Sequence, residues 1–217
     1  MKEYKYILFD LDGTLSDPGE GIINSLKYAL KQFGIDGDPQ VLRKFIGPPL
    51  ADSFQEFYNF DEEKTKEAIR IYRAYFHDHG VLQNVIYPGI PELLEDLTKA
   101  GKSLAVATTK PEIYAHQVLA YFEIDHFFRK DLVVGSYLDG RRTNKAELIA
   151  TAIERLGGES HEKVMVGDRK YDIIGAKANG IDVIGVTYGY GEFTEIEVHE
   201  PTAIAASIDE LRDLLLN

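Results

Sequence analysis

Acidic side chains directly follow two short apolar segments of the sequence. Asp10 and Asp12 come after Tyr6-Ile7-Leu8-Phe9, and Asp168 comes after Val164-Met165-Val166-Gly167. A short apolar run that ends in Asp or Gly is typical of a buried strand, and the carboxyl ends of parallel strands form one edge of a sheet. Three carboxylates at one edge repel one another unless a cation lies among them. Because the set contains no His or Cys, its hard oxygen ligands favour Mg²⁺ over zinc.

Each of these acids also has an ordinary structural interpretation. The segment Asp10-Leu11-Asp12-Gly13 could be a plain turn, since Asp and Gly are common in turns. Asp168 could cap the helix that we expect near Tyr171, and Asp172 could be a first-turn acid that suits the helix dipole. On neighbouring strand ends, however, the acids together favour a set of metal ligands that includes both Asp168 and Asp172.

A pair of threonines follows another apolar strand. The segment Thr108-Thr109-Lys110-Pro111 has the composition of a helix start, in which Thr109 is the cap and Pro111 occupies an early helical position. One interpretation is a helix cap and nothing more. The other is a phosphate site, in which threonine hydroxyls and N–H groups at the helix N-terminus donate to the anion.

Lys145 occupies a predicted helix position that is unfavourable for a cation. Asn144 as the cap and Glu147 three residues later predict a helix that places Lys145 in its first turn. A cation there opposes the helix dipole by roughly 0.3–1 kcal/mol. Such violations of a local rule are expected where function overrides stability, although a surface lysine tolerated by solvent is the alternative.

Strands and helices alternate along the sequence after Tyr87-Pro88-Gly89. Beyond the first strand we expect strands at 103–108, 132–134, 163–166 and 183–186, and helices at 91–100, 111–122, 145–156, 171–179 and 208–215. This alternation predicts an α/β fold, a Rossmann-like and mostly parallel sheet with helices on both faces.

Between Pro18 and Leu82 the apolar residues instead recur with helical spacing. Helices are expected from about Pro18 to Gly34, at 51–59 and at 62–79, and no segment there has the pattern of a strand. The simplest organisation is an α/β domain of residues 1–16 and 83–217 that is interrupted by an all-helical insert of residues 17–82. The many aromatic side chains of the insert are expected to fill its core.

The composition excludes several classes of protein. The chain has no cysteine and a net charge of −12, and its isoelectric point is about 4.9. Disulfides and thiolate chemistry are therefore excluded, and so acidic a chain disfavours nucleic acids and anionic membranes as partners. No apolar run is long enough for a membrane span or a signal peptide, so we expect a cytoplasmic protein.

Four separated segments resemble the four motifs of the haloacid dehalogenase superfamily, in order and in spacing over essentially the whole chain. They are Asp10-Leu11-Asp12-Gly13-Thr14-Leu15 with Asp17, Thr108 after its strand, Lys145, and Gly167-Asp168-Arg169-Lys170-Tyr171-Asp172. The helical insert resembles the small cap domain of that family. The segments Thr108–Pro111 and Phe45-Ile46-Gly47-Pro48-Pro49-Leu50 are similar to the phosphoglycolate-phosphatase-like branch.

The resemblance implies a role for each matching residue. Asp10 would be the nucleophile that forms an aspartyl phosphate, and Asp12 would be the general acid and base. Thr108 and Lys145 would hold the non-bridging phosphate oxygens, and Lys145 would also keep Asp10 ionised and oriented.

The resemblance also implies the ligands of the metal and of the substrate. Mg²⁺ would be bound by Asp10, the backbone carbonyl of Asp12 and Asp168, with Asp172 as an outer-shell or additional carboxylate. The residues expected to bind substrate are Thr14, Thr109, Arg43 and Lys44.

These residues together predict a Mg²⁺-dependent phosphomonoesterase for a small phosphorylated metabolite, phosphoglycolate-like or a nucleoside monophosphate. Dehalogenases do not carry an acid at the position of Asp12, because a halide leaves without a proton. Two alternatives are a phosphomutase on a sugar phosphate and a phosphometabolite-binding protein without activity. The sequence leaves open whether the protein is a monomer or a homodimer.

Overall fold

The computed structural model describes residues 3–216, which form two compact units. One unit contains the chain up to Ser16 and from Ile86 onward, and the other contains Asp17–Val85. Two short strands, β2 (Ser16–Asp17) and β3 (Val85–Ile86), pair with each other where the chain passes from one unit to the other and back. The second unit is therefore an insertion into the first, directly after the first strand.

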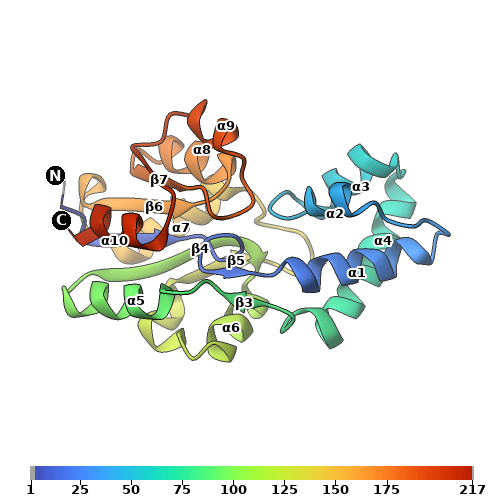
Figure 1. The fold of residues 1–217 in the computed structure, drawn as a ribbon, viewed down its shortest axis with the longest axis horizontal. Coiled ribbons are helices and arrows are strands. Elements are labelled where there is room, and N and C mark those ends of the chain that lie inside the picture. The colour runs from blue at the N-terminus through green and yellow to red at the C-terminus, as the bar shows by residue number, and fades with distance from the viewer. Residues whose placement is uncertain (1–2, 217) are drawn as a thin grey trace. The chain divides into compact units, whose positions relative to one another are not determined.

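The first unit is built on a six-stranded sheet (Figure 1). Its strand order is β5-β4-β1-β6-β7-β8, and every neighbouring pair is parallel. The strands are β1 (Tyr6–Phe9), β4 (Ser103–Pro111), β5 (Val133–Ser136), β6 (Lys163–Gly167), β7 (Asp182–Val186) and β8 (Ala203–Ala205). The predicted parallel α/β sheet is confirmed.

The central strand β1 determines where a site can form. Phe9 lies in register with Val106 on β4 and with Val166 on β6, so the residues that follow these three positions emerge at one edge of the sheet. The chain adds β4 and β5 on one side of β1 and then β6, β7 and β8 on the other. Ligands of open α/β sheets bind at such a reversal, beyond the carboxyl ends of the strands.

Helices cover both faces of this sheet, as predicted. On one face α7 (Lys145–Leu156) and α8 (Lys170–Ala178) pack onto a fully buried apolar layer that includes Leu8, Ala105 and Met165. Right-handed crossovers put α5 (Ile90–Lys99) and α6 (Glu112–Tyr121) on the opposite face (Figure 1). The remaining helical segments of this unit are α9 (Phe193–Glu197), α10 (Ile208–Leu216), and the 3₁₀ turns Asp125–Phe127, Lys130–Leu132 and Ser160–Glu162.

The second unit is helical throughout. Its helices are α1 (Gly19–Lys31), α2 (Pro39–Arg43), α3 (Leu50–Tyr58) and α4 (Glu62–Tyr75), followed by a π-helical turn at Phe76–Gly80. Phe54 is fully buried and stacks on Phe60, with ring centroids 5.7 Å apart, and Phe45 meets Phe54 edge-on at 5.1 Å. The aromatic residues thus fill the core of this unit, as predicted.

Several short elements differ from the prediction. The helix expected at 62–79 ends as α-helix at Tyr75, and α2, α9 and β8 were not predicted. Elements of three to five residues carry too few apolar positions to show a period. Among residues 3–216, no helix is both long and apolar enough to cross a membrane.

Candidate active site

Asp10 is held rigidly at the end of the central strand. Its N–H donates to the carbonyl oxygen of Val166 at 2.9 Å, which extends the pairing of β1 with β6. Its carboxylate Oδ1 accepts the N–H of Leu11 at 2.7 Å, and the residue is buried. The carboxylate therefore has a fixed direction before any substrate arrives.

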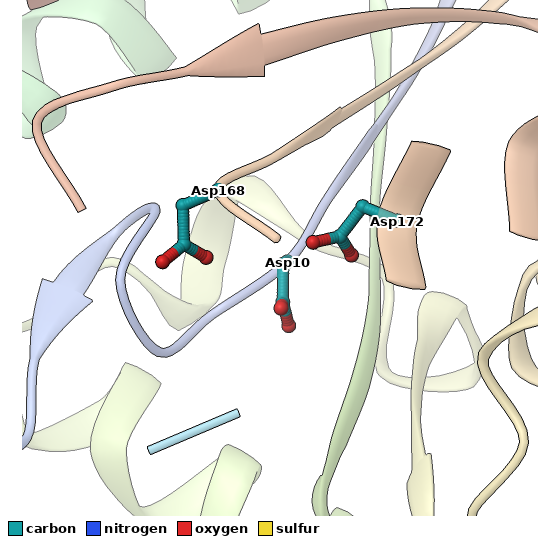
Figure 2. Close-up of side chains that lie close together, drawn as sticks. All are labelled: Asp10, Asp168 and Asp172. Carbon is teal, nitrogen blue, oxygen red and sulfur yellow. The ribbon is translucent and has the colours of Figure 1, made fainter. Parts of the chain in front are cut away.

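Two further carboxylates lie beside Asp10 (Figure 2). Asp168 follows β6 and Asp172 lies in the first turn of α8, and ligand oxygens of the three acids all lie within 4.8 Å of one another. Both added acids are completely buried. The structure thus brings together three of the four predicted metal-binding residues through their side chains.

Backbone N–H groups orient the two added acids. Asp168 accepts the N–H of Tyr190 at 2.7 Å and the hydroxyl of Thr14 at 3.4 Å. Asp172 accepts the N–H of Arg169 at 3.1 Å. Asp168 is not the cap of α8, because the helix starts at Lys170 and Arg169 occupies the cap position.

The cluster carries an excess of negative charge that burial makes costly. Burial, with the charges of Asp172 and Asp10, raises the pKa of Asp168 to about 8. Burial also raises the pKa of Asp172, and although Asp10 adds to this shift, Lys145 opposes it. Three buried carboxylates without a His or Cys form a donor set that fits Mg²⁺, because a hard dication would relieve this repulsion.

Lys145 is the cation of this cluster. Its Nζ lies 2.9 Å from Asp10 Oδ2 and 2.8 Å from Asp172 Oδ1, and it donates to the carbonyl oxygen of Ala107 at 2.9 Å. Burial opposes the charged form, but the two carboxylates outweigh it and raise the pKa of Lys145. Asn144 caps α7, so Lys145 lies in the first turn as predicted, and its burial excludes the surface interpretation.

The Asp12 side chain contacts a different cation, Lys110. The Lys110 Nζ donates to both carboxylate oxygens of Asp12, at 2.9 and 2.7 Å, and the two side chains are 3% and 17% exposed. Burial raises the pKa of Asp12, and Lys110 opposes this shift. Lys110 is a residue of this site that was not predicted.

The segment from Thr108 to Pro111 is strand, so the predicted cap at Thr109 is wrong, although α6 starts within one residue of the predicted helix. β4 continues to Pro111, which is itself the N-cap of α6, and Thr109 caps no helix. The strand is irregular here, because its pairing with β5 shifts register between Ala107 and Pro111, so the placement of Lys110 does not follow from simple alternation. Both Thr108 and Lys110 are buried. The Thr108 hydroxyl accepts the N–H of Lys110 at 3.2 Å.

Glycines allow the loop after β7 to approach the acids closely. A Cβ at Gly189 would overlap the carbonyl oxygen of Gly13 and the side chain of Asp168, and one at Gly191 would overlap the carbonyl oxygen of Asp168. The Tyr188 hydroxyl donates to the carbonyl oxygen of Thr14 at 3.1 Å. The Gly-Tyr-Gly sequence after a strand was the available signal for this wall of the site.

An ion pair between Arg169 and Glu195 fixes the segment that carries Asp168. Arg169 Nε donates to Glu195 Oε1 at 2.9 Å, and the same oxygen accepts the N–H of Lys170 at 3.0 Å. This pair joins α9 to the start of α8. No pattern in the sequence pointed to Glu195, because its helix is only five residues long.

The remaining predicted substrate residues lie in different surroundings. Thr14 is buried beside Asp168, and the carbonyl oxygen of Thr109 accepts the hydroxyl of Ser136 at 2.7 Å. Arg43 and Lys44 are exposed at the end of α2 in the helical unit, where the Lys44 Nζ lies 5.9 Å from the ring centroid of Phe57. Their role toward a substrate stays a prediction.

Comparison with known proteins identifies the family. Residues 7–186 match the family model described as haloacid dehalogenase-like hydrolase. The chain belongs to this family. The membership inferred from the four motifs is thereby confirmed, and with it the class of enzyme, a hydrolase of the haloacid dehalogenase-like family whose similar proteins include phosphatases.

Three proteins of known sequence or structure are similar to this chain over nearly its whole length. A 5'-nucleotidase of Pseudomonas aeruginosa is 44% identical over 214 residues, which are 98% of this chain and 96% of that protein. The tyrosine-protein kinase PtkA of Mycobacterium tuberculosis is 39% identical over 96% of this chain and 72% of its own length. The crystal structure of a predicted phosphatase from Clostridium acetobutylicum has a TM-score of 0.93 and 46% identity, with 99% of each chain covered.

Proposed function

We propose that this hydrolase is a Mg²⁺-dependent phosphomonoesterase that cleaves a small phosphorylated metabolite through a phosphorylated Asp10. The observation that carries the proposal is the convergence of Asp10, Asp168 and Asp172, two of which, Asp10 and Asp172, contact the buried Lys145. A carboxylate nucleophile, a cation beside it and a set of hard oxygen ligands are the parts that phosphoryl transfer needs.

The metal site would consist of the side chains of Asp10 and Asp168 and the backbone carbonyl of Asp12, with Asp172 as an outer-shell or additional carboxylate. When bound, Mg²⁺ would neutralise charge that develops on the phosphoryl group. Thr14 and the Tyr190 N–H keep Asp168 oriented. These contacts leave less rearrangement to occur when the ion binds.

The first step transfers the phosphoryl group to Asp10. An oxygen of the Asp10 carboxylate attacks phosphorus and forms a new O–P bond, while the ester P–O bond breaks. The leaving oxygen takes the proton of the Asp12 carboxyl group, and this general-acid step is worth about 10²–10⁴ in rate. Lys145 and the Thr108 hydroxyl stabilise the charge on the non-bridging oxygens.

The second step returns Asp10 to its initial state. Water gives a proton to the Asp12 carboxylate and attacks phosphorus, and the bond between phosphorus and Asp10 breaks. Inorganic phosphate leaves, and the acid and base have exchanged roles in the order that microscopic reversibility requires. The same residue thus serves both half-reactions.

We assign the selection of the substrate to the helical unit. We assign the catalytic core to residues 1–16 and 83–217 and the cap to residues 17–82, with Arg43 and Lys44 directed to the distal part of an anionic substrate. The similarity to a 5'-nucleotidase supports a nucleoside monophosphate, and the similarity to phosphoglycolate phosphatases supports phosphoglycolate. Location in the cytoplasm and a monomeric or dimeric state stay predictions.

Product analysis distinguishes this activity from its alternatives. A phosphomutase would return the phosphoryl group to a sugar, and the similarity to PtkA raises transfer to a tyrosine hydroxyl as a further alternative. Phosphate release from a panel of phosphorylated metabolites should be supported by Mg²⁺ and abolished by EDTA. Isomerised sugar phosphate or phosphotyrosine without free phosphate would contradict the proposal.

The variant Asp10→Asn tests the nucleophile. An amide cannot attack phosphorus, so kcat should fall more than about a thousandfold, as when other covalent nucleophiles are removed. Phosphate release and thermal unfolding are measured on the same preparation. A folded Asp10→Asn protein that keeps appreciable activity would exclude Asp10 as the nucleophile.

A further inference from the structure

We propose that Lys110 is a positioning residue that fixes the Asp12 carboxyl group in the direction from which it exchanges a proton with the leaving group. This inference rests on the proposed phosphomonoesterase function. It concerns a residue that none of the four family motifs includes as a functional position.

The geometry separates Lys110 from the other lysine of the site. Lys145 contacts Asp10 and Asp172, whereas Lys110 donates to both oxygens of Asp12. A contact to both oxygens restricts rotation of the carboxyl group about its last bond, which a contact to one oxygen does not. Each lysine therefore orients a different acid.

The burial of Lys110 makes its ion pair with Asp12 more important than an exposed pair would be. Lys110 is 6% exposed, so its ammonium has lost most of its water and depends on the protein for partners. The backbone of Lys110 is also tied to Thr108, the residue assigned to the phosphate oxygens, because the Thr108 hydroxyl accepts the N–H of Lys110 at 3.2 Å. The strand that holds the phosphate thus also fixes the position of the acid relative to it.

The need for the Asp12 proton differs between leaving groups. When an alkyl ester is cleaved, the P–O bond breaks as the Asp12 proton moves to the leaving oxygen, because an alkoxide is a poor leaving group. Nitrophenolate is a stable anion and leaves without that proton. Misplacing Asp12 should therefore slow the first step with an alkyl phosphate and spare the first step with p-nitrophenyl phosphate.

The test compares kcat/KM for these two substrates in Lys110→Met and Lys110→Gln. Both variants should lose at least about tenfold more in kcat/KM on the alkyl phosphate than on p-nitrophenyl phosphate, because kcat/KM reports the first step, whereas kcat also contains the second step that both substrates share. Asp12→Asn should show the same selectivity, and Asp12→Asn/Lys110→Met should be no slower than Asp12→Asn. Lys110→Arg, which keeps the charge, should recover part of the selective loss. Lys110→Gln keeps a donor for Asp12, so it serves if Lys110→Met does not fold.

Lys163 offers a matched control. It is a fully buried lysine at the opposite end of the strands, held by the carbonyl oxygens of Gly158 and Glu159 at 2.6 and 3.0 Å. Any loss in Lys163→Met should be equal for the two substrates. Thermal unfolding in EDTA gives a second readout. Lys110→Met should lower the unfolding midpoint, because it leaves the Asp12 carboxylate without its cation. Adding Asp12→Asn to Lys110→Met should restore part of that loss.

Two results would overturn the inference. An equal loss on both substrates that appears in KM and persists in the Asp12→Asn background would make Lys110 a substrate-binding residue. If a folded Lys110→Met protein had unchanged kinetics on both substrates, the position of Asp12 would not depend on Lys110. Failure of the proposed function is distinct, because the unaltered enzyme would then release phosphate from neither substrate.

Discussion

Lys145 and Lys110 neutralise different carboxylates at the same edge of the sheet. The misplaced charge in the first turn of α7 identified Lys145 from the sequence, because a cation there has a measurable local cost. Lys110 lies on a strand, where a cation violates no such rule, and only the coordinates pair it with Asp12. At the scale of residues, a candidate functional residue can be predicted from the sequence when its type is unfavourable for local stability, as that of Lys145 is.

The Asp168 carboxylate is predicted to destabilise the metal-free protein at neutral and alkaline pH. Its pKa in the folded state, about 8, lies above its ordinary value of 3.8, so the folded protein binds the extra proton between these two values. Stability from this group is therefore complete below about pH 4 and is lost as the pH rises toward 8. In the proposed metal site, Mg²⁺ would take the place of that proton.

The variant Asp168→Asn tests this prediction. In EDTA at pH 8 it should be more stable than the unaltered protein by more than about 1 kcal/mol, and the difference should shrink toward pH 4. It should also lose the stabilisation by Mg²⁺ that the unaltered protein shows. Denaturant unfolding across pH measures both effects. An Asp168→Asn protein that is less stable in EDTA at pH 8 would contradict the electrostatic account.

The bounds of the elements that carry the site residues were predicted only in part. The β1 strand and the starts of α7 and α8 were predicted to within a residue, because β1 is a continuous apolar run, α7 has a clear cap and α8 closely follows another apolar run. The end of β4 was not, because Thr and Pro suit a helix start as well as a strand. The loop after β7 has no period at all, and its glycines matter only through atoms that are distant in sequence.

Gly189→Ala should test that loop. The added methyl group would push against Gly13 and Asp168, so the free energy of unfolding should fall by about 1–3 kcal/mol and Mg²⁺ should bind more weakly. Gly101→Ala is the control: its φ of 76° strains an alanine by about 1 kcal/mol, but no atom lies within 4 Å of the added carbon. Calorimetric titration of Mg²⁺ that finds both variants equal in affinity would exclude a role of the loop in the metal site.

At the scale of the whole molecule, the chemistry and its selectivity are assigned to separate units of the chain. The fold class and the family were predictable because the motifs fall at the ends of parallel strands. The substrate was not, since the side chains proposed to select it lie in a helical unit whose sequence pattern reports mainly its aromatic core. Because the net charge is −12, the proposed recognition of an anionic substrate depends on local cations such as Arg43.

The double variant Arg43→Ala/Lys44→Ala tests this division. It should raise KM for the preferred metabolite about fivefold, the effect of losing roughly 1 kcal/mol, while KM for p-nitrophenyl phosphate stays unchanged. Both side chains are exposed, so the fold should tolerate their loss. Unchanged KM values for every substrate of the panel would remove Arg43 and Lys44 from substrate recognition.

The central claim is that Asp10 receives the phosphoryl group beside a Mg²⁺ ion shared with Asp168. Its most direct test is a crystal structure of the protein with Mg²⁺ and beryllium fluoride, which mimics a phosphoryl group on a carboxylate. We predict fluoroberyllate bonded to an Asp10 oxygen and a Mg²⁺ ion bound by Asp10 and Asp168. Fluoroberyllate bonded to another residue, or Mg²⁺ bound away from these acids, would contradict the account.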